Sequence, residues 1–198
     1  MTLTSDKKLL LSKARTCGVS DVMEIMGFRR TVIVGFRCTT GGDAVVGSAF
    51  TIRQVPKHSP ATADQRLCRH GEVSRSLAKE GDFVILDAGG RTDVAGWGGH
   101  HSERCQSRGV SGVLVNGSIR DFSEIKDMGF AAFHLGTSPI SSKWDQETAE
   151  FNGSVNVGGV HIKAGDIIVG DEDGLVVIAV EQLDQVIEKL RAKQGVAE

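Results

Sequence analysis

The sequence is poor in several residue types, and each shortage limits what the protein can be. It has no Tyr and only 3 Pro among 198 residues, and aromatic residues make up 5% of the chain. The formal net charge is −2, from 23 basic and 25 acidic side chains, and no basic run is interleaved with aromatics. Nucleic-acid-binding surfaces combine clustered positive charge with stacking side chains, so nucleic acid is not an expected partner.

Long apolar runs and paired cysteines are also missing. No stretch approaches the roughly 18 apolar residues that would span a bilayer, and the first segment, MTLTSDKKLLLSKARTCG, is too poor in apolar residues for a signal peptide. Cys17, Cys38, Cys68 and Cys105 lie far apart and form no CxxC pair. Such spacing is typical of buried thiols in a reducing compartment. We therefore expect a soluble, cytoplasmic protein with no membrane partner.

Glycine is abundant, at 25 residues, and punctuates a regular succession of apolar segments. Their spacing predicts helices over 7–26 (two, broken near Cys17-Gly18), 64–79, 98–108, 123–128 and 181–193. Strands are predicted over 31–34, 44–55, 82–87, 113–115, 131–135, 155–162, 167–169 and 175–178. The alternation between 82 and 135 predicts a mostly parallel core covered on two sides. Because no repeat or linker interrupts the chain, we expect one α/β domain over 1–198.

Two predicted loops each follow a strand and precede a helix, where ligands of α/β proteins gather. The first is DAGGRTD at 87–93, in which Gly89 and Gly90 allow backbone N–H groups to converge on an anion before a helix. Arg91 and Thr92 follow directly and are candidate substrate-binding residues. Two glycines after a strand can equally form a simple turn.

The second loop, NGSIRD at 116–121, places a cation beside a carboxylate. Arg120 can bind a substrate carboxylate through two parallel hydrogen bonds, and Asp121 can hold Mg²⁺ or Mn²⁺ directly or through water. A solvated or salt-bridged pair is the alternative interpretation of the same dipeptide.

The order and spacing of these motifs resemble one family along most of the chain. GDFVILDAGG (81–90), RGVSG (108–112) and NGSIRD (116–121) are followed by LGTSP (135–139), VGGV (157–160), AGD (164–166) and DEDG (171–174). In this order they are similar to the 4-hydroxy-4-methyl-2-oxoglutarate aldolases and the regulators of ribonuclease activity A (RraA-like proteins). Several ordered motifs are far more specific than any one of them.

The resemblance implies a single-domain, swivelling-phosphohistidine-domain-like β/β/α sandwich that forms homotrimers or homohexamers with sites between subunits. It further implies that pyruvate lies on backbone amides of the glycine loop and that Arg120 binds its carboxylate and stabilises the enolate. Asp121 is expected to hold a divalent cation, Mg²⁺ or Mn²⁺, largely through water. The expected activity is that of a metal-dependent carbon–carbon lyase, an aldolase or decarboxylase, acting on a small 2-oxo acid through a pyruvate enolate.

This sequence departs from the family pattern at three places. Arg91 stands where the aldolases usually carry an acidic residue, with Asp93 two positions later, and Asn116 stands where Asp is common. In place of WGELL the chain has WGGHH at 97–101, so Gly99 replaces a Glu. These changes affect the part of the site that meets the rest of the substrate, and oxaloacetate decarboxylation makes the fewest demands on that part.

The two adjacent imidazoles of this segment are new acid–base candidates, and we take His100 as a catalytic residue. Neighbouring helical residues point about 100° apart, so His100 and His101 are not expected to face one ligand together; a polar interface is the alternative role. Metal-bound water is the expected proton carrier. Two other functions stay open: a non-catalytic RraA-like regulator that binds protein, and a related lyase or hydrolase that uses His100 or His101 on another substrate.

Overall fold

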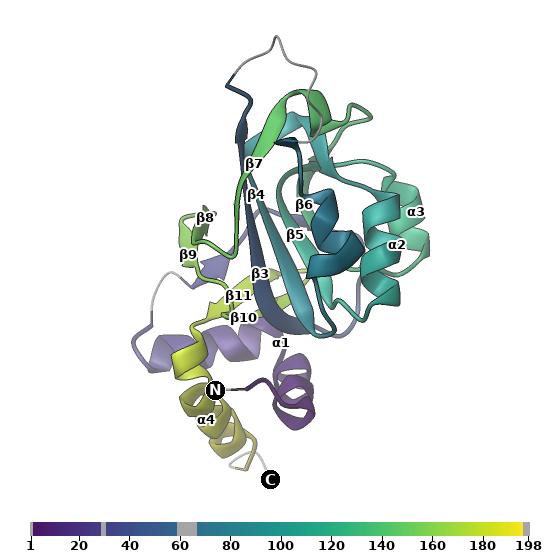
Figure 1. The fold of residues 1–198 in the computed structure, drawn as a ribbon. Coiled ribbons are helices and arrows are strands. Elements are labelled where there is room, and N and C mark those ends of the chain that lie inside the picture. Colours follow the sequence, from purple (N-terminus) through teal and green to yellow (C-terminus); the bar gives the residue numbers. More distant parts are fainter. Residues whose placement is uncertain (1, 29–30, 59–66, 196–198) are drawn as a thin grey trace.

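The computed structural model describes residues 2–28, 31–58 and 67–195, and its centre is a strongly curved mixed sheet (Figure 1). Across the described residues the strand order is β1-β11-β10-β3-β4-β5-β6-β2, with β7 paired to β3. The strand bounds are β1 Val32–Ile33, β2 Arg37–Cys38, β3 Val45–Pro56, β4 Asp82–Trp97, β5 Gly112–Ile119, β6 Ala132–Thr137, β7 Gln146–Phe151, β8 Val155–Val157, β9 Val160–Ile162, β10 Ile167–Asp171 and β11 Gly174–Ile178.

The expectation of a mostly parallel core is right only for the centre of this sheet. Strands β3, β4, β5 and β6 run parallel, and residues 83–86 of β4 are buried in an unbroken run, as strands covered on both faces require. Strands β1, β2, β7, β10 and β11 pair antiparallel. Short turns join several of these outer strands, such as the one between β10 and β11, and only antiparallel neighbours can be joined in that way.

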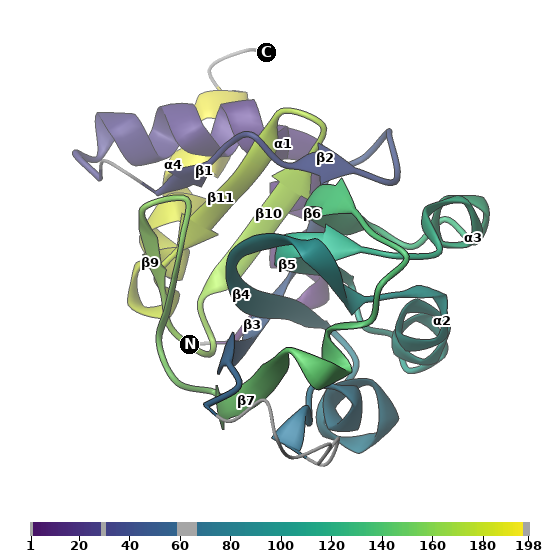
Figure 2. The same cartoon turned by 90° about the horizontal axis from the view of Figure 1, so that it is seen from above.

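Helices cover the sheet in two groups (Figure 2). The helical segments are α1 Ser5–Ile25, a π-helical turn at Val73–Leu77, α2 Gly99–Ser107, α3 Phe122–Asp127 and α4 Leu183–Gly195, with 3₁₀ turns at Ser142–Trp144 and Val180–Gln182. One apolar cluster lies under α2 and α3, and a second lies under α1 and α4. A third fills the inside of the curved sheet, where the hairpin of β8 and β9 closes it. This is the layered β/β/α arrangement of one α/β fold.

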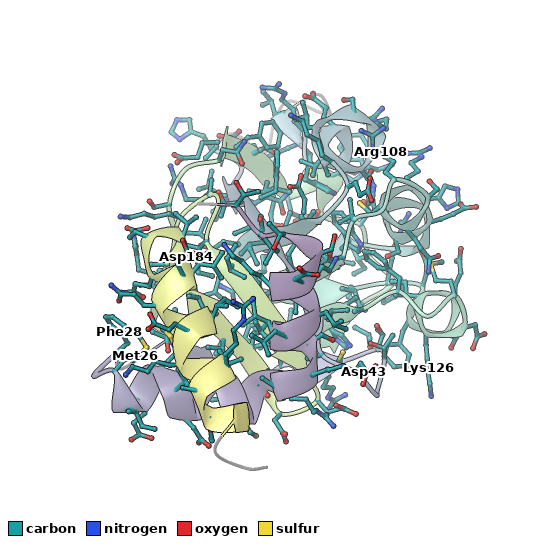
Figure 3. All side chains as sticks on the ribbon, turned by 90° about the horizontal axis from the view of Figure 1, so that it is seen from below. Met26, Phe28, Asp43, Arg108, Lys126 and Asp184 are labelled. Carbon is teal, nitrogen blue, oxygen red and sulfur yellow. The ribbon has the colours of Figure 1, made fainter. Side chains whose placement is uncertain are left out.

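Helix α1 is kinked at Arg15, two residues before the expected break at Cys17-Gly18. Arg15 has φ 59° and ψ 177°, and the two arms of the helix lie beside α4 (Figure 3). The buried carboxylate of Asp171 accepts hydrogen bonds from the Thr16 amide at 3.1 Å and the Thr16 hydroxyl at 2.6 Å. The kink therefore occurs where a distant carboxylate replaces the helix's own acceptors.

Strands β4 and β5 are both longer than predicted, and this changes the glycine segment. Gly89 and Gly90 have positive φ, 68° and 75°, but β4 continues past them as a bulged strand paired with β5. They therefore lie within a strand and not in a loop that leads directly into a helix. Of the predicted helix over 64–79, residues 64–66 lie outside the described residues, and only a single π-helical turn forms beyond them. In the described part of the chain, no helix combines the length and apolarity needed to cross a membrane.

Candidate active site

Arg120 and Asp121 form the turn between the end of β5 and the start of α3. The Arg120 amide donates to the Trp97 carbonyl at 3.0 Å, which ties this turn to the end of β4. Asp121 adopts a left-handed conformation with φ 57° and ψ 38°, which is uncommon for a residue other than glycine and recurs at functional sites. Both residues line a surface pocket of about 340 Å³ together with Thr137, Ser138 and Pro139, which follow β6.

The N-terminus of α2 lies directly against this pair. The Gly99 amide donates to Asp121 Oδ2 at 3.1 Å, and Arg120 Nε lies 3.5 Å from the same oxygen. A Cβ on Gly98 would lie 2.9 Å from both Arg120 Cγ and Asp121 Oδ2, so only glycine permits this approach. The free amides of a helix's first turn attract anions. The Arg120 guanidinium and the N-terminus of α2 thus both lie beside the Asp121 carboxylate.

Gly99 has a further neighbour on α3. A Cβ at this position would lie 2.5 Å from Oε2 of Glu124. The Glu124 carboxylate therefore occupies the space in which a side chain at position 99 would begin. Two carboxylates, from Asp121 and Glu124, flank the first residues of α2.

The glycine segment of β4 does not reach this pocket. Arg91 is held in an ion pair with Asp93, with Nε–Oδ1 at 2.7 Å and Nη2–Oδ2 at 2.8 Å, and also contacts Asp145. The Gly89 amide donates to Asp87 Oδ1 at 3.0 Å. Gly89, Gly90, Arg91 and Thr92 are not among the residues that line the Arg120 pocket. Their substrate-binding role stays a prediction. It would require a substrate that extends from the Arg120 pocket to the glycine segment of β4.

The two histidines of α2 point apart, as their spacing predicts. His100 is exposed and lines neither the Arg120 pocket nor the cavity beside it. His101 turns inward, with its ring centroid 5.1 Å from that of Trp97 and 5.3 Å from that of His70. His101 and Arg120 line one cavity of about 40 Å³, whose wall is completed by His70, Ala95, Gly96, Trp97, Gly98 and Ser141. His101 is thus nearer to the candidate site than His100.

Burial determines the charge state of both inward imidazoles. Burial, with smaller contributions from the nearby His101 and Arg75, lowers the pKa of His70 to about 3. Burial likewise lowers the pKa of His101 to about 4, with Arg104 and Arg120 as the next causes. Both rings are therefore neutral near pH 7. The sequence did not single out His70, and nothing in its local pattern signals that it packs against His101.

The donor set suits a cation that is held mostly by water and substrate. Among the described residues, no group of three or more His, Cys, Asp or Glu side chains is arranged around a metal position. Asp121 Oδ2 is engaged by Gly99 and Arg120, while Oδ1 has no hydrogen-bond partner in the described part of the chain. Mg²⁺ commonly binds through one or two carboxylates and keeps several waters. Asp121 fits that pattern.

In this curved α/β sandwich, the Arg120 guanidinium and the Asp121 carboxylate line one pocket, and the N-terminus of α2 contacts that carboxylate. The chain belongs to the RraA-like family, because the Aldolase/RraA family model matches residues 16–177. The expected fold and the resemblance to this family are both confirmed.

Individual relatives agree with this membership. An uncharacterized protein of Methanocaldococcus jannaschii is 39% identical over 117 residues, or 59% of this chain. A Halalkalibacterium halodurans protein named "Putative 4-hydroxy-4-methyl-2-oxoglutarate aldolase" is 36% identical over 118 residues, or 60% of this chain. Both alignments cover 56% of the relative, so the chain spans about half the length of these relatives.

Solved structures match the fold over nearly the whole chain. Streptomyces coelicolor RraAS2, described as an unusual member of the RNase ES inhibitor RraA protein family, superposes with a TM-score of 0.85 at 21% identity. That match covers 99% of this chain and 96% of RraAS2. An uncharacterized Pseudomonas syringae protein also gives a TM-score of 0.85, at 20% identity, covering 98% of this chain and 86% of that protein. At sequence identities this low, the similarity shows only that the fold is shared.

Proposed function

We propose that this protein is a divalent-metal-dependent carbon–carbon lyase that cleaves a small 2-oxo acid through a pyruvate enolate. The observation that carries the proposal is that Arg120 and Asp121 line one pocket, while the Gly99 amide at the start of α2 donates to Asp121. Pyruvate and its precursors present a carboxylate and an adjacent 2-oxo group. The pocket offers a complementary partner for each.

Each part of the pocket has a definite task in this proposal. The Arg120 guanidinium binds the substrate carboxylate and places a fixed positive charge near the oxygen that becomes the enolate. The first turn of α2 contributes through Asp121, whose Oδ2 accepts a hydrogen bond from the Gly99 amide. No Lys is among the described residues that line the pocket, so the proposed chemistry does not use a Schiff base.

Asp121 is the residue that would hold Mg²⁺ or Mn²⁺. Such an ion, when bound, supplies a Lewis acid for the 2-oxo group. The Gly99 amide and Arg120 Nε fix the orientation of Oδ2, which leaves Oδ1 for the cation. The substrate and its metal are therefore expected to share the space between β5, β6 and α2.

The experiment measures pyruvate released from oxaloacetate and from 4-hydroxy-4-methyl-2-oxoglutarate, each with Mg²⁺, with Mn²⁺ and with EDTA. Pyruvate that appears with metal and disappears with EDTA supports the lyase. Absence of pyruvate from both substrates, with folded protein and either metal, would reject this activity for these two acids.

A protein-binding regulator is the second candidate function. It is favoured by the fold likeness to RraAS2, which is described as an unusual member of the RNase ES inhibitor RraA protein family. It is also favoured by the exposed side chains of Trp144 and of Ile140, which follows the pocket-lining Pro139. A regulator of this kind would need no metal. Metal-independent inhibition of an RNase E-type enzyme, without pyruvate release, would support it over the lyase.

A further inference from the structure

We propose that His101 is the general base of this site when a substrate is cleaved by a retro-aldol reaction. The inference rests on the proposed lyase function and deepens it, because a hydroxyl proton must be removed in an aldol cleavage and is absent in a decarboxylation. The geometry around the His101 ring carries it.

The cavity beside His101 shares a lining residue with the candidate site. Arg120 lines both this cavity of about 40 Å³ and the larger surface pocket of about 340 Å³. The smaller volume has room for a water molecule but not for a substrate. In our proposal, a water in the smaller cavity relays the proton between His101 and a substrate in the larger pocket, an arrangement that general base catalysis permits.

Ser74 contacts one nitrogen of the His101 ring. Its buried hydroxyl lies 3.1 Å from the Gly71 carbonyl and 2.9 Å from His101 Nδ1. When the hydroxyl donates to the carbonyl, its oxygen accepts from Nδ1–H, and Nε2 then carries the lone pair. The proposal requires this tautomer. Among the described residues Nε2 has no hydrogen-bond partner, so it is free to accept a proton.

Burial, and after it the positive groups around the ring, keep His101 neutral. The titratable and charged groups that face it are His70 and Arg75 from the segment before β4, His100 and Arg104 from α2, and Arg120 from the turn after β5. No carboxylate of the described residues is among these groups, and the ring is in its uncharged, basic form near pH 7. Trp97 and His70 pack against the ring and keep it in place.

The proton balance of an aldol cleavage fits this arrangement. Nε2, through the water, takes the proton of the C4 hydroxyl, and the O–H electron pair forms the new carbonyl. The C3–C4 bond breaks and its electron pair becomes the enolate, which Arg120 stabilises. The imidazolium then returns the proton to C3, giving pyruvate and a second carbonyl compound without net gain or loss of protons. Decarboxylation of oxaloacetate releases CO₂ and takes its proton from solvent, so it needs no base.

The test compares both reactions in matched substitutions. In His101→Gln, retro-aldol kcat should fall by about 100-fold or more, while oxaloacetate decarboxylation stays within about threefold of the unaltered protein. His161→Gln, on the exposed hairpin of β8 and β9, should change neither rate. Equal losses of both reactions in His101→Gln would overturn the proposal. So would a selective loss in His100→Gln, which would return the role to the exposed imidazole.

A second measurement does not depend on turnover. Long-range ¹H–¹⁵N NMR of the His101 imidazole near pH 6 should show a neutral ring protonated on Nδ1. A ring protonated on Nε2, or charged at this pH, would reject the proposal even in an active enzyme. If instead the unaltered protein releases pyruvate from neither substrate, the lyase function fails, and the NMR result still decides the state of His101.

Discussion

Arg120 combines three relations at one position. Its amide is bound to the end of β4, its Nε lies beside Asp121, and its side chain lines two adjoining cavities. The turn is held by the backbone amide of Arg120. A substitution of the side chain therefore removes the guanidinium without removing the turn. The side chain's contribution to chemistry can therefore be separated from its contribution to folding.

Arg120→Ala should abolish pyruvate release, since the substrate carboxylate and the developing enolate lose their fixed positive charge. We expect kcat/KM to fall by about a thousandfold, and Arg120→Lys to restore only part of it because an ammonium cannot form the paired hydrogen bonds. Steady-state kinetics measures the loss, and Mn²⁺ binding followed by EPR should persist through Asp121. Normal kcat/KM in Arg120→Ala would contradict the mechanism.

The buried imidazoles make stability depend on pH. The pKa values of His70 and His101 lie at about 3 and about 4 in the folded protein, against an ordinary value of 6.5. Between about pH 6.5 and pH 3 the unfolded chain binds more protons. The free energy of unfolding is therefore highest above pH 6.5 and falls as the pH is lowered through this window.

Urea titrations at about pH 7.5 and about pH 4.5 should show a lower midpoint at the acid pH. His70→Gln should reduce the difference between the two midpoints, because one group that protonates preferentially in the unfolded chain is gone. His161→Gln, with an exposed ring, serves as the control and should leave the difference unchanged. A pH difference that persists fully in His70→Gln would show that other groups cause it.

At the scale of elements, the site depends on how closely α2 approaches the turn after β5. Gly98 has φ −167°, an extended conformation that any residue adopts, so its glycine is required by space and not by backbone strain. Gly98→Ala should push α2 away from Arg120 and Asp121. We expect kcat/KM to fall by about 10- to 100-fold, since small displacements of positioned groups have effects of this size.

Gly18→Ala provides the matched control for that substitution. Gly18 lies within α1, and a Cβ there would make only an ordinary contact with Ala14 at 3.6 Å. This change should leave activity intact and stabilise the helix by up to about 1 kcal/mol. Kinetics and thermal unfolding of both variants test the pair; unchanged kinetics in Gly98→Ala would mean that the approach of α2 is not needed.

Helices and strands could be predicted from the sequence where the local residue pattern agrees with the strand pairing in the fold. The run of Val84, Ile85 and Leu86 predicted the first half of β4, but its second half forms only because β5 pairs with it through bulges. The glycine pair at 89–90 was expected to form a loop, but it lies within β4. The helix predicted over 98–108 is present as α2, which begins at Gly99.

The contrast between local residue pattern and tertiary contact also explains which features of the site could be predicted. Arg120 and Asp121 were identified because they follow a strand and because their motif resembles the family. The divergence of His100 and His101 followed from helical geometry. Which of the two faces inward depends on where α2 begins and on the packing of Ser74 and His70, which are distant in sequence. Local pattern contains no information about those contacts.

At the scale of the whole molecule, the pocket of Arg120 lies at the surface, near exposed apolar side chains. Ile140 and Trp144, just after the pocket-lining Pro139, are 58% and 46% exposed. Together with the family resemblance, this supports our proposal that the protein assembles as a homotrimer or homohexamer with sites near subunit contacts. Light scattering after size-exclusion chromatography should give three or six times the mass of the chain. Ile140→Ser should weaken that assembly, and a monomer for the unaltered protein would reject it.

The contact between Gly99 and Glu124 has a consequence for how this family's sequences are compared. Position 99 is glycine here, where the sequence resemblance implies Glu. In space, the carboxylate of Glu124 occupies the volume that a side chain at 99 would enter. In this protein α3, and not α2, supplies the acid at the start of α2. Positions 99 and 124 should vary together, with a small residue at one whenever a long acid stands at the other.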